Sequence, residues 1–242
     1  KNDSYKVIPG SGVPSRYCSK DIFLKNRWLE KKSKKSFKYE DISFIYCGRL
    51  IKSKGIFIFL DLLKEFPKSK GLVFGDIDPS SKDSLKSYDL EKLSKKYPNV
   101  SFEGNVKDPL LNIKEAYPIL IVPSNYGEGI SRSIVEALIL KIPIICSKTA
   151  LSGIFNDNYL FYTEINQSEF YRKIVFEIID SYKTNNKISS LLESGYKKAK
   201  NNLIEEKIVQ STISIYDKLL KENNSSYLIK NQKFNESFWL AQ

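Results

Sequence analysis

The chain has 242 residues, of which 41% are hydrophobic, and its formal net charge is +11. This length is sufficient for one substantial hydrophobic core with appendages. The chain contains no histidine, which excludes Ser-His-Asp and Cys-His mechanisms and removes the commonest ligand of transition metals. Any catalysis would therefore use carboxylates, lysines, arginines and backbone groups.

Cysteine usage and the lack of long apolar runs both favour a cytoplasmic protein. Cys18, Cys47 and Cys146 are widely spaced and odd in number, which favours buried thiols in a reducing compartment over disulfides. No apolar run approaches the roughly 20 residues that a membrane-spanning helix needs, and the first residues do not resemble a signal peptide. Because the sequence does not begin with methionine, we also expect a fragment of a longer protein.

In chain order, the hydrophobic pattern first predicts a strand running into a Gly-rich turn at 5–13 and a basic loop at 31–38. Short β-rich runs then alternate with longer amphipathic runs. The expected series is strand 42–47, helix 56–66, strand 71–75, helix 84–97, strand 100–103, helix 110–116, strand 118–122, helix 131–140, strand 142–146, strand 159–162 and helices 167–182, 187–200 and 205–221. This series predicts an α/β fold, with a Rossmann-like, mostly parallel sheet covered by helices on both faces and followed by C-terminal helices.

Residues 48–55, Gly-Arg-Leu-Ile-Lys-Ser-Lys-Gly, join the first strand of this series to its helix. The cations Arg49 and Lys54 are flanked by glycines that let the backbone approach a ligand, and the helix N-terminus adds its own positive end. The loop therefore predicts a diphosphate-binding site, although an ordinary basic surface loop fits the same residues. It matches neither the Walker A motif nor the dinucleotide-binding G-x-G-x-x-G motif.

A second loop and the helix after it present two carboxylates, Glu128 and Glu136. Glu128 lies between glycines, and eight residues of helix would separate the pair by about 12 Å, roughly the reach from the hexose to the ribose of a nucleoside diphosphate sugar. Carboxylates accept hydrogen bonds from sugar hydroxyls, and the N–H groups of Gly129 and Ile130 would be available to the diphosphate. In the alternative interpretation, Glu136 is a solvated helix residue and Glu128 a first-turn carboxylate favoured by the helix dipole.

Together with three other motifs, these loops resemble the C-terminal half of family-four glycosyltransferases of the GT-B fold. The resemblance rests on KVIPGSGV, GRLIKSKG, VFGDIDPSSKDSL, VSFEGNVKDP and VPSNYGEGISRSIVEALILKIPIICSKT, which occur in order from about Val7 to Tyr162. It implies retaining transfer of a sugar from a UDP- or GDP-sugar to a glycan or lipid-linked acceptor. The Asp-Ile-Asp-Pro segment is similar to the bacterial branch that builds surface polysaccharides such as lipopolysaccharide.

The resemblance also implies a role for each candidate residue. Glu128 would hold the donor hexose and Glu136 the ribose, while Arg49 and Lys54 would neutralise the diphosphate and stabilise it as the leaving group. The nucleotide site would also include the turn glycine Gly12 and the backbone of Gly129, Ile130, Gly104, Asn105 and Val106, the last three beside the base. We expect no metal and no other cofactor, because the cations already meet the diphosphate.

The same resemblance divides the chain into four parts. Residues 1–13 would be a hinge or linker strand, and 14–200 the donor-binding domain. Residues 201–222 would form a helix that packs back towards an absent N-terminal domain, and 223–242 a tail. We expect the fragment alone to be inactive, because the acceptor would bind mainly to the absent domain.

Three other functions are open to the sequence. A sugar-nucleotide 2-epimerase of similar fold would be expected to use histidine, which the chain lacks. A non-catalytic module that binds nucleotide sugars is also open, although the presence of all four charged candidates argues against a loss of activity; these are Arg49, Lys54, Glu128 and Glu136. Nucleic acid is not an expected partner because the lysines are scattered along the chain. Peripheral contact with an anionic membrane would use the same positive charge.

Overall fold

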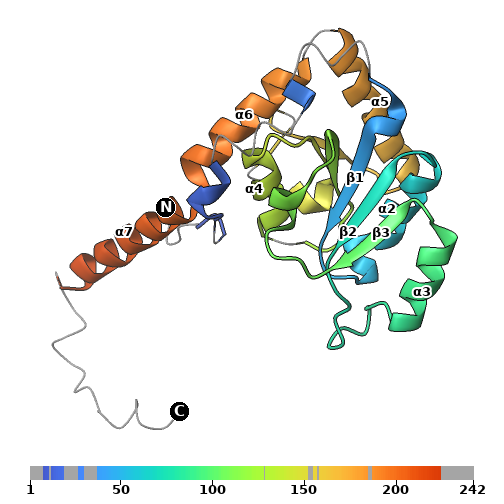
Figure 1. Cartoon of the computed structure of the whole chain (residues 1–242). Helices are drawn as coiled ribbons and strands as arrows, with labels where there is room; N and C mark the ends of the chain where they lie inside the picture. The colour runs from blue at the N-terminus through green and yellow to red at the C-terminus, as the bar shows by residue number, and fades with distance from the viewer. Residues whose placement is uncertain are drawn as a thin grey trace.

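The computed structural model describes residues 8–10, 12–18, 27–29, 37–127, 129–151, 155–156, 158–184 and 187–224. Its centre is a six-stranded, wholly parallel sheet (Figure 1). The strands are β1 (Ile42–Cys47), β2 (Lys70–Phe74), β3 (Val100–Gly104), β4 (Tyr117–Val122), β5 (Ile144–Ser147) and β6 (Phe161–Thr163). Their order across the sheet is β3-β2-β1-β4-β5-β6. The direction of progression therefore reverses between β1 and β4, which makes a topological switch point there.

Helices cover both faces of the sheet. The helices are α2 (Ile56–Lys64), α3 (Ser87–Lys96), α4 (Arg132–Ile139), α5 (Ser168–Thr184), α6 (Lys187–Asn202) and α7 (Glu205–Asn224). Short 3-10 helices lie at Ser15–Cys18, Arg27–Leu29, Tyr39–Asp41, Lys52–Lys54, Pro109–Asn112 and Lys148–Leu151. The helices α2 and α5 pack in one core cluster and α4 in the other, whereas α6 contributes to both.

The strand β1 shows why the sheet is buried on both sides. Phe44 and Tyr46 enter the core cluster beneath α2 and α5, while Ile45 enters the cluster beneath α4. Such alternation of apolar residues on both faces is typical of a central parallel strand. The sheet therefore forms a rigid platform, and its loops are free to carry the site.

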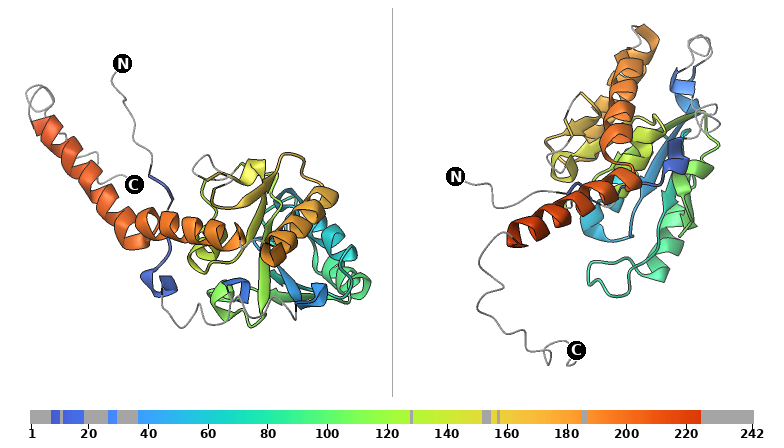
Figure 2. Two further views of the ribbon diagram at one scale, coloured as in Figure 1. Left: turned by 90° about the horizontal axis from the view of Figure 1, so that it is seen from above. Right: turned by 90° about the vertical axis from the view of Figure 1, so that its left-hand side faces the viewer.

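The last helix, α7, extends away from the body of the domain (Figures 1 and 2). Its first turn packs into the core through Ile208, but further along Val209, Ile213, Tyr216 and Leu220 are exposed. No helix in the described part of the chain is long and apolar enough to cross a membrane.

Several predicted boundaries shift for identifiable reasons. The helix expected at 84–97 begins at Ser87, because Ser84 pairs with Ile51 and the N–H of Leu85 donates to the Leu50 carbonyl at 2.8 Å. The strand expected from residue 142 begins two residues later, because the N–H of Ile142 closes the end of α4. The helix expected at 110–116 is only a four-residue 3-10 turn.

The N-terminal strand prediction does not hold where it can be examined. Residues 8–10 are not a strand, and Val13 forms a single isolated bridge with Ile204. The rest of that segment, at 5–7 and 11, lies outside the described residues, as does most of the expected basic loop, at 31–36. The tail from residue 225 is also outside them, and α7 continues to Asn224.

Candidate functional site

A cleft lies beyond the carboxyl ends of the four strands from β3 to β4. Its larger cavity measures about 910 Å³, and a smaller one of about 260 Å³ shares part of its wall. The shared lining residues are Cys47, Gly48, Arg49, Arg132 and Ser133. The cleft therefore spans the switch point between β1 and β4, where open parallel sheets bind ligands.

Two close backbone contacts hold the loops around this cleft together. Gly55 has a φ of 78°, and a Cβ at this position would lie 1.9 Å from the carbonyl oxygen of Pro123. A Cβ on Gly75 would lie 2.0 Å from the carbonyl oxygen of Gly48. Only glycine fits either place. The loops that follow β1, β2 and β4 are therefore in direct contact and share one cleft.

The structure brings Arg49 and Lys54 together at the smaller cavity, and their role towards a diphosphate stays a prediction. The Arg49 side chain is 55% exposed, and its Nη1 pairs with Asp78 Oδ2 at 2.6 Å. The buried Tyr46 hydroxyl donates to the Arg49 carbonyl at 3.0 Å. Lys54 is half-buried, with its Nζ 5.2 Å from the ring centroid of Tyr126.

The charge of Arg49 acts on Lys54. Burial, and then the charge of Arg49, lower the pKa of Lys54 below its ordinary value. Burial and a neighbouring cation both disfavour the protonated amine. An anion placed between the two side chains would relieve this repulsion, so the loop is electrostatically suited to a phosphate group.

Glu136 is buried and faces the larger cavity. Residues 133–139 of α4 are all buried, and Glu136 is only 5% exposed. Arg132 Nε donates to Glu136 Oε1 at 2.7 Å. The interpretation of Glu136 as a solvated helix residue is therefore wrong, because a carboxylate so far from water requires a charged or hydrogen-bonding partner.

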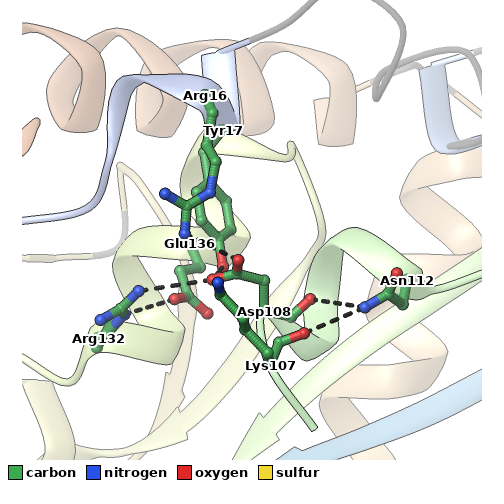
Figure 3. A network of polar contacts seen from close by, with 7 residues as sticks. All are labelled: Arg16, Tyr17, Lys107, Asp108, Asn112, Arg132 and Glu136. Carbon is green, nitrogen blue, oxygen red and sulfur yellow. Dashed lines mark hydrogen bonds and ion pairs between the residues drawn. The ribbon is translucent and has the colours of Figure 1, made fainter.

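A polar network joins this helix to the start of the domain (Figure 3). Asp108 accepts hydrogen bonds from Arg16 Nη2 at 2.8 Å and from the Tyr17 hydroxyl at 3.0 Å. Arg132 Nη2 lies 3.7 Å from Asp108 Oδ1. Burial raises the pKa of Tyr17, and the charge of Glu136 and the hydrogen bond to Asp108 raise it further. The phenol of Tyr17 therefore remains protonated and acts as a donor.

Burial also acts on Asp108, but its partners outweigh it. Burial alone would raise the pKa of this carboxyl, whereas the hydrogen bonds from Arg16 and Tyr17 and the charges of Arg16 and Arg132 hold it below its usual range. Asp108 therefore stays ionised at neutral pH. Because Arg16, Asp108, Arg132 and Glu136 all line the larger cavity, the network forms part of the cleft wall.

The remaining predicted residues are placed unevenly. Asn105 and Val106 line the larger cavity, and Gly104 immediately precedes them as the last residue of β3. Gly129 and Ile130 are not among the lining residues of either cavity. Glu128 lies outside the described residues, so its predicted spacing from Glu136 stays a prediction.

Gly12 lies at a different place from the cleft residues. It packs against Leu203 and Glu205, where α6 gives way to α7, and lines neither cavity. The structure thus gives Gly12 a packing role between the start of the chain and α7.

Sequence reasoning missed six charged residues that line the larger cavity: Arg16, Asp76, Asp78, Lys107, Asp108 and Arg132. Arg132 had a readable signal, because it precedes Glu136 by four residues on one helix face. Asp78 follows a different strand from Arg49, and no local pattern along the chain connects the two residues. Among the described residues, no group of three or more Cys, Asp or Glu side chains is arranged to hold a metal ion.

A comparison with protein families matches residues 29–208 to the family described as Glycosyl transferases group 1. Among curated proteins, the chain is 33% identical over 104 residues to the putative teichuronic acid biosynthesis glycosyltransferase TuaC of Bacillus subtilis. This match covers 43% of the chain and 24% of TuaC.

Three solved structures illustrate the fold that this chain shares. A glycosyltransferase from Rickettsia africae matches with a TM-score of 0.69 at 20% identity, over 89% of this chain and 57% of that one. Anabaena HepE in complex with UDP matches with a TM-score of 0.66 at 17% identity, over 86% of this chain and 56% of HepE. Sucrose-phosphate synthase from Thermosynechococcus elongatus matches with a TM-score of 0.68 at 18% identity, over 90% of this chain and 53% of the synthase. The likeness shows the fold, a Rossmann-like domain of GT-B type, and the chain spans little more than half of each of these structures.

Proposed function

We propose a function for this chain on the basis of its family, because it belongs to the group 1 family of glycosyl transferases. It is the donor-binding half of a retaining enzyme, and this enzyme transfers a sugar from a nucleoside diphosphate sugar. The observation that carries this proposal is the convergence of Arg49, Lys54 and Glu136 on one cleft at the switch point of the sheet. Cations suit a diphosphate, and a fixed carboxylate suits a sugar hydroxyl.

Each residue then has a defined task. Lys54 and Arg49 bind the diphosphate and stabilise the negative charge that grows on it as the bond to the sugar breaks, so that no metal is needed. Glu136 accepts hydrogen bonds from the ribose, and Asn105 and Val106 lie beside the base. Glu128 would contact the transferred sugar from the loop before α4.

The similar proteins support a proposal for the kind of donor and for the kind of pathway. Anabaena HepE has been solved with UDP and with UDP-glucose, which favours a UDP-sugar over a GDP-sugar as the donor here. The similarity to a teichuronic acid enzyme supports a role in bacterial surface polysaccharide synthesis. The acceptor would then be a glycan or a lipid-linked glycan at the cytoplasmic face of the membrane.

Thermal unfolding with a panel of nucleotides and nucleotide sugars tests the proposal without requiring the acceptor. A ligand at about 100 times its dissociation constant adds roughly 2.7 kcal/mol to the free energy of unfolding. We expect stabilisation by a nucleoside diphosphate and its sugar, and none by the matching nucleoside at equal concentration. Stabilisation by duplex DNA that UDP and GDP do not relieve would instead support nucleic-acid binding.

The same chain should bind a donor without transferring its sugar. The acceptor site is expected on the part of the enzyme that lies outside this sequence. Measurable transfer by residues 1–242 to an acceptor would contradict this division of labour, whereas donor hydrolysis alone would not.

A further inference from the structure

The carboxylate of Glu136 is fixed by an arginine one turn earlier on the same helix. The Arg132 contact occupies Glu136 Oε1, and the Glu136 side chain is 6% exposed, whereas that of Arg132 is 55% exposed. A carboxylate can accept hydrogen bonds at both oxygens. Arg132 therefore leaves Glu136 with capacity for a ligand in the cavity that both residues line.

Arg132 is itself held from a second side. Its Nη2 lies 3.7 Å from Asp108, which is tied to Arg16 and Tyr17 by hydrogen bonds of 2.8 and 3.0 Å. Figure 3 shows the guanidinium facing the carboxyl groups of Glu136 and Asp108, which both lie on the same side of it. A planar guanidinium that contacts two carboxylates has its orientation fixed by both. Its Nε and Nη2 atoms are directed at these two carboxylates.

We propose that Arg132 is a positioning residue of the cleft, which orients the carboxylate of Glu136 towards the ribose of a bound nucleotide and thereby sets the preference for ribose over deoxyribose. The inference rests on the proposed function, because it takes Glu136 as the ribose-binding residue. Without Arg132, the Glu136 side chain keeps its contact with Tyr17 but loses the guanidinium that helps to select its rotamer and balances its buried charge. The ribose contact then weakens, while the diphosphate contacts remain.

The ratio of two affinities isolates this role. Isothermal titration calorimetry with UDP and 2′-deoxy-UDP, and with the corresponding guanosine pair, gives the ribose preference of each variant. We expect a wild-type preference of about tenfold or more, the value of a hydrogen bond to a charged acceptor. Glu136→Gln and Arg132→Ala should each bring the ratio towards one. The double variant should show no further change, since both substitutions remove the same contact.

A control removes an arginine–glutamate ion pair outside the cleft, although its carboxylate is more exposed than that of Glu136. Arg172 on α5 pairs with Glu65 at 2.8 Å and lines neither cavity of the cleft. Arg172→Ala should leave both affinities and their ratio unchanged. If Arg132→Ala does not fold, Arg132→Gln carries the same comparison, because glutamine keeps a polar side chain but lacks the charge.

The outcomes distinguish this inference from the proposed function. If Arg132→Ala weakens UDP and 2′-deoxy-UDP by the same factor, Arg132 supports the phosphates or the fold and the inference is overturned alone. If the wild type binds UDP and GDP without a ribose preference, the role of Glu136 is overturned together with the inference. If the wild type binds none of the nucleotides, the proposed function itself fails.

Discussion

Replacing Lys54 with alanine should weaken the binding of UDP or GDP more than replacing Arg49 does. Arg49 is 55% exposed and already paired with Asp78 at 2.6 Å. A bound diphosphate would have to compete with Asp78 for the guanidinium. The net free energy of binding gained from Arg49 is therefore reduced by the free energy of the ion pair that is lost. Exposed ion pairs are worth about 0–1 kcal/mol, so Arg49→Ala should cost at most about fivefold in affinity.

Lys54 differs from Arg49 in being less exposed. It is half-buried, and both its burial and the charge of Arg49 lower its pKa, so part of the cost of removing it from water is already met before binding. A charge-assisted hydrogen bond in this setting is worth about 1.5–3 kcal/mol. Lys54→Ala should therefore weaken the diphosphate by about 10- to 150-fold.

Calorimetric titration of UDP, UMP and uridine into both variants measures this difference. We expect the loss to grow with the number of phosphates and to be absent for uridine. A larger loss for Arg49→Ala than for Lys54→Ala would show that the exposure of Arg49 and its pairing with Asp78 do not limit its contribution. An equal loss for uridine and UDP would show that these residues maintain the fold of the loop instead of binding phosphate.

Four further predictions follow from the same geometry. Gly55→Ala should reduce the free energy of unfolding, measured in urea, by about 2 kcal/mol or more. In the control Gly127→Ala, the new Cβ would meet nothing within 4 Å, so the free energy of unfolding should change by no more than about 0.5 kcal/mol. Similar losses in both variants would contradict the packing argument. In calorimetry, Glu136→Gln should weaken UDP and UDP-glucose by one factor, whereas Glu128→Gln should spare UDP and weaken UDP-glucose; the reverse pattern would exchange their roles. Because the pKa of Lys54 is lowered, affinity for UDP should fall as the pH rises through that pKa, and UDP binding at alkaline pH should take up protons. Calorimetric titrations in buffers of different ionisation enthalpy detect this uptake. Proton uptake that persists in Lys54→Ala would have to come from another group. EDTA should leave UDP binding unchanged, and restoration of lost affinity by Mg²⁺ would argue for a metal.

The order of strands and helices was readable because local pattern and tertiary fold agree. The run from Ile42 to Cys47 is a buried parallel strand, as its apolar residues indicate. Boundaries failed where a tertiary contact competes with local propensity. Ser84 and Leu85 are compatible with a helix, but they pair with the loop after β1 instead.

The site was only half readable for a related physical reason. Arg49, Lys54 and Glu136 stood out because each belongs to a short motif beside a strand or helix. Asp78 and Asp108 did not, because their partners lie far along the chain: 29 residues separate Arg49 from Asp78, and 92 separate Arg16 from Asp108. Contacts of this kind follow from strand order, which brings the loops after separate strands to one edge of the sheet.

A crystal structure of this chain with a bound nucleoside diphosphate would show directly whether the cleft at β1 and β4 is the donor site. We predict that the diphosphate lies between Arg49 and Lys54 and that the ribose hydroxyls contact the carboxylate of Glu136. The cavity of about 390 Å³ lined by residues of β6, α5 and α6 is the natural alternative location. Nucleotide bound there, with the cleft at β1 and β4 empty, would contradict the account.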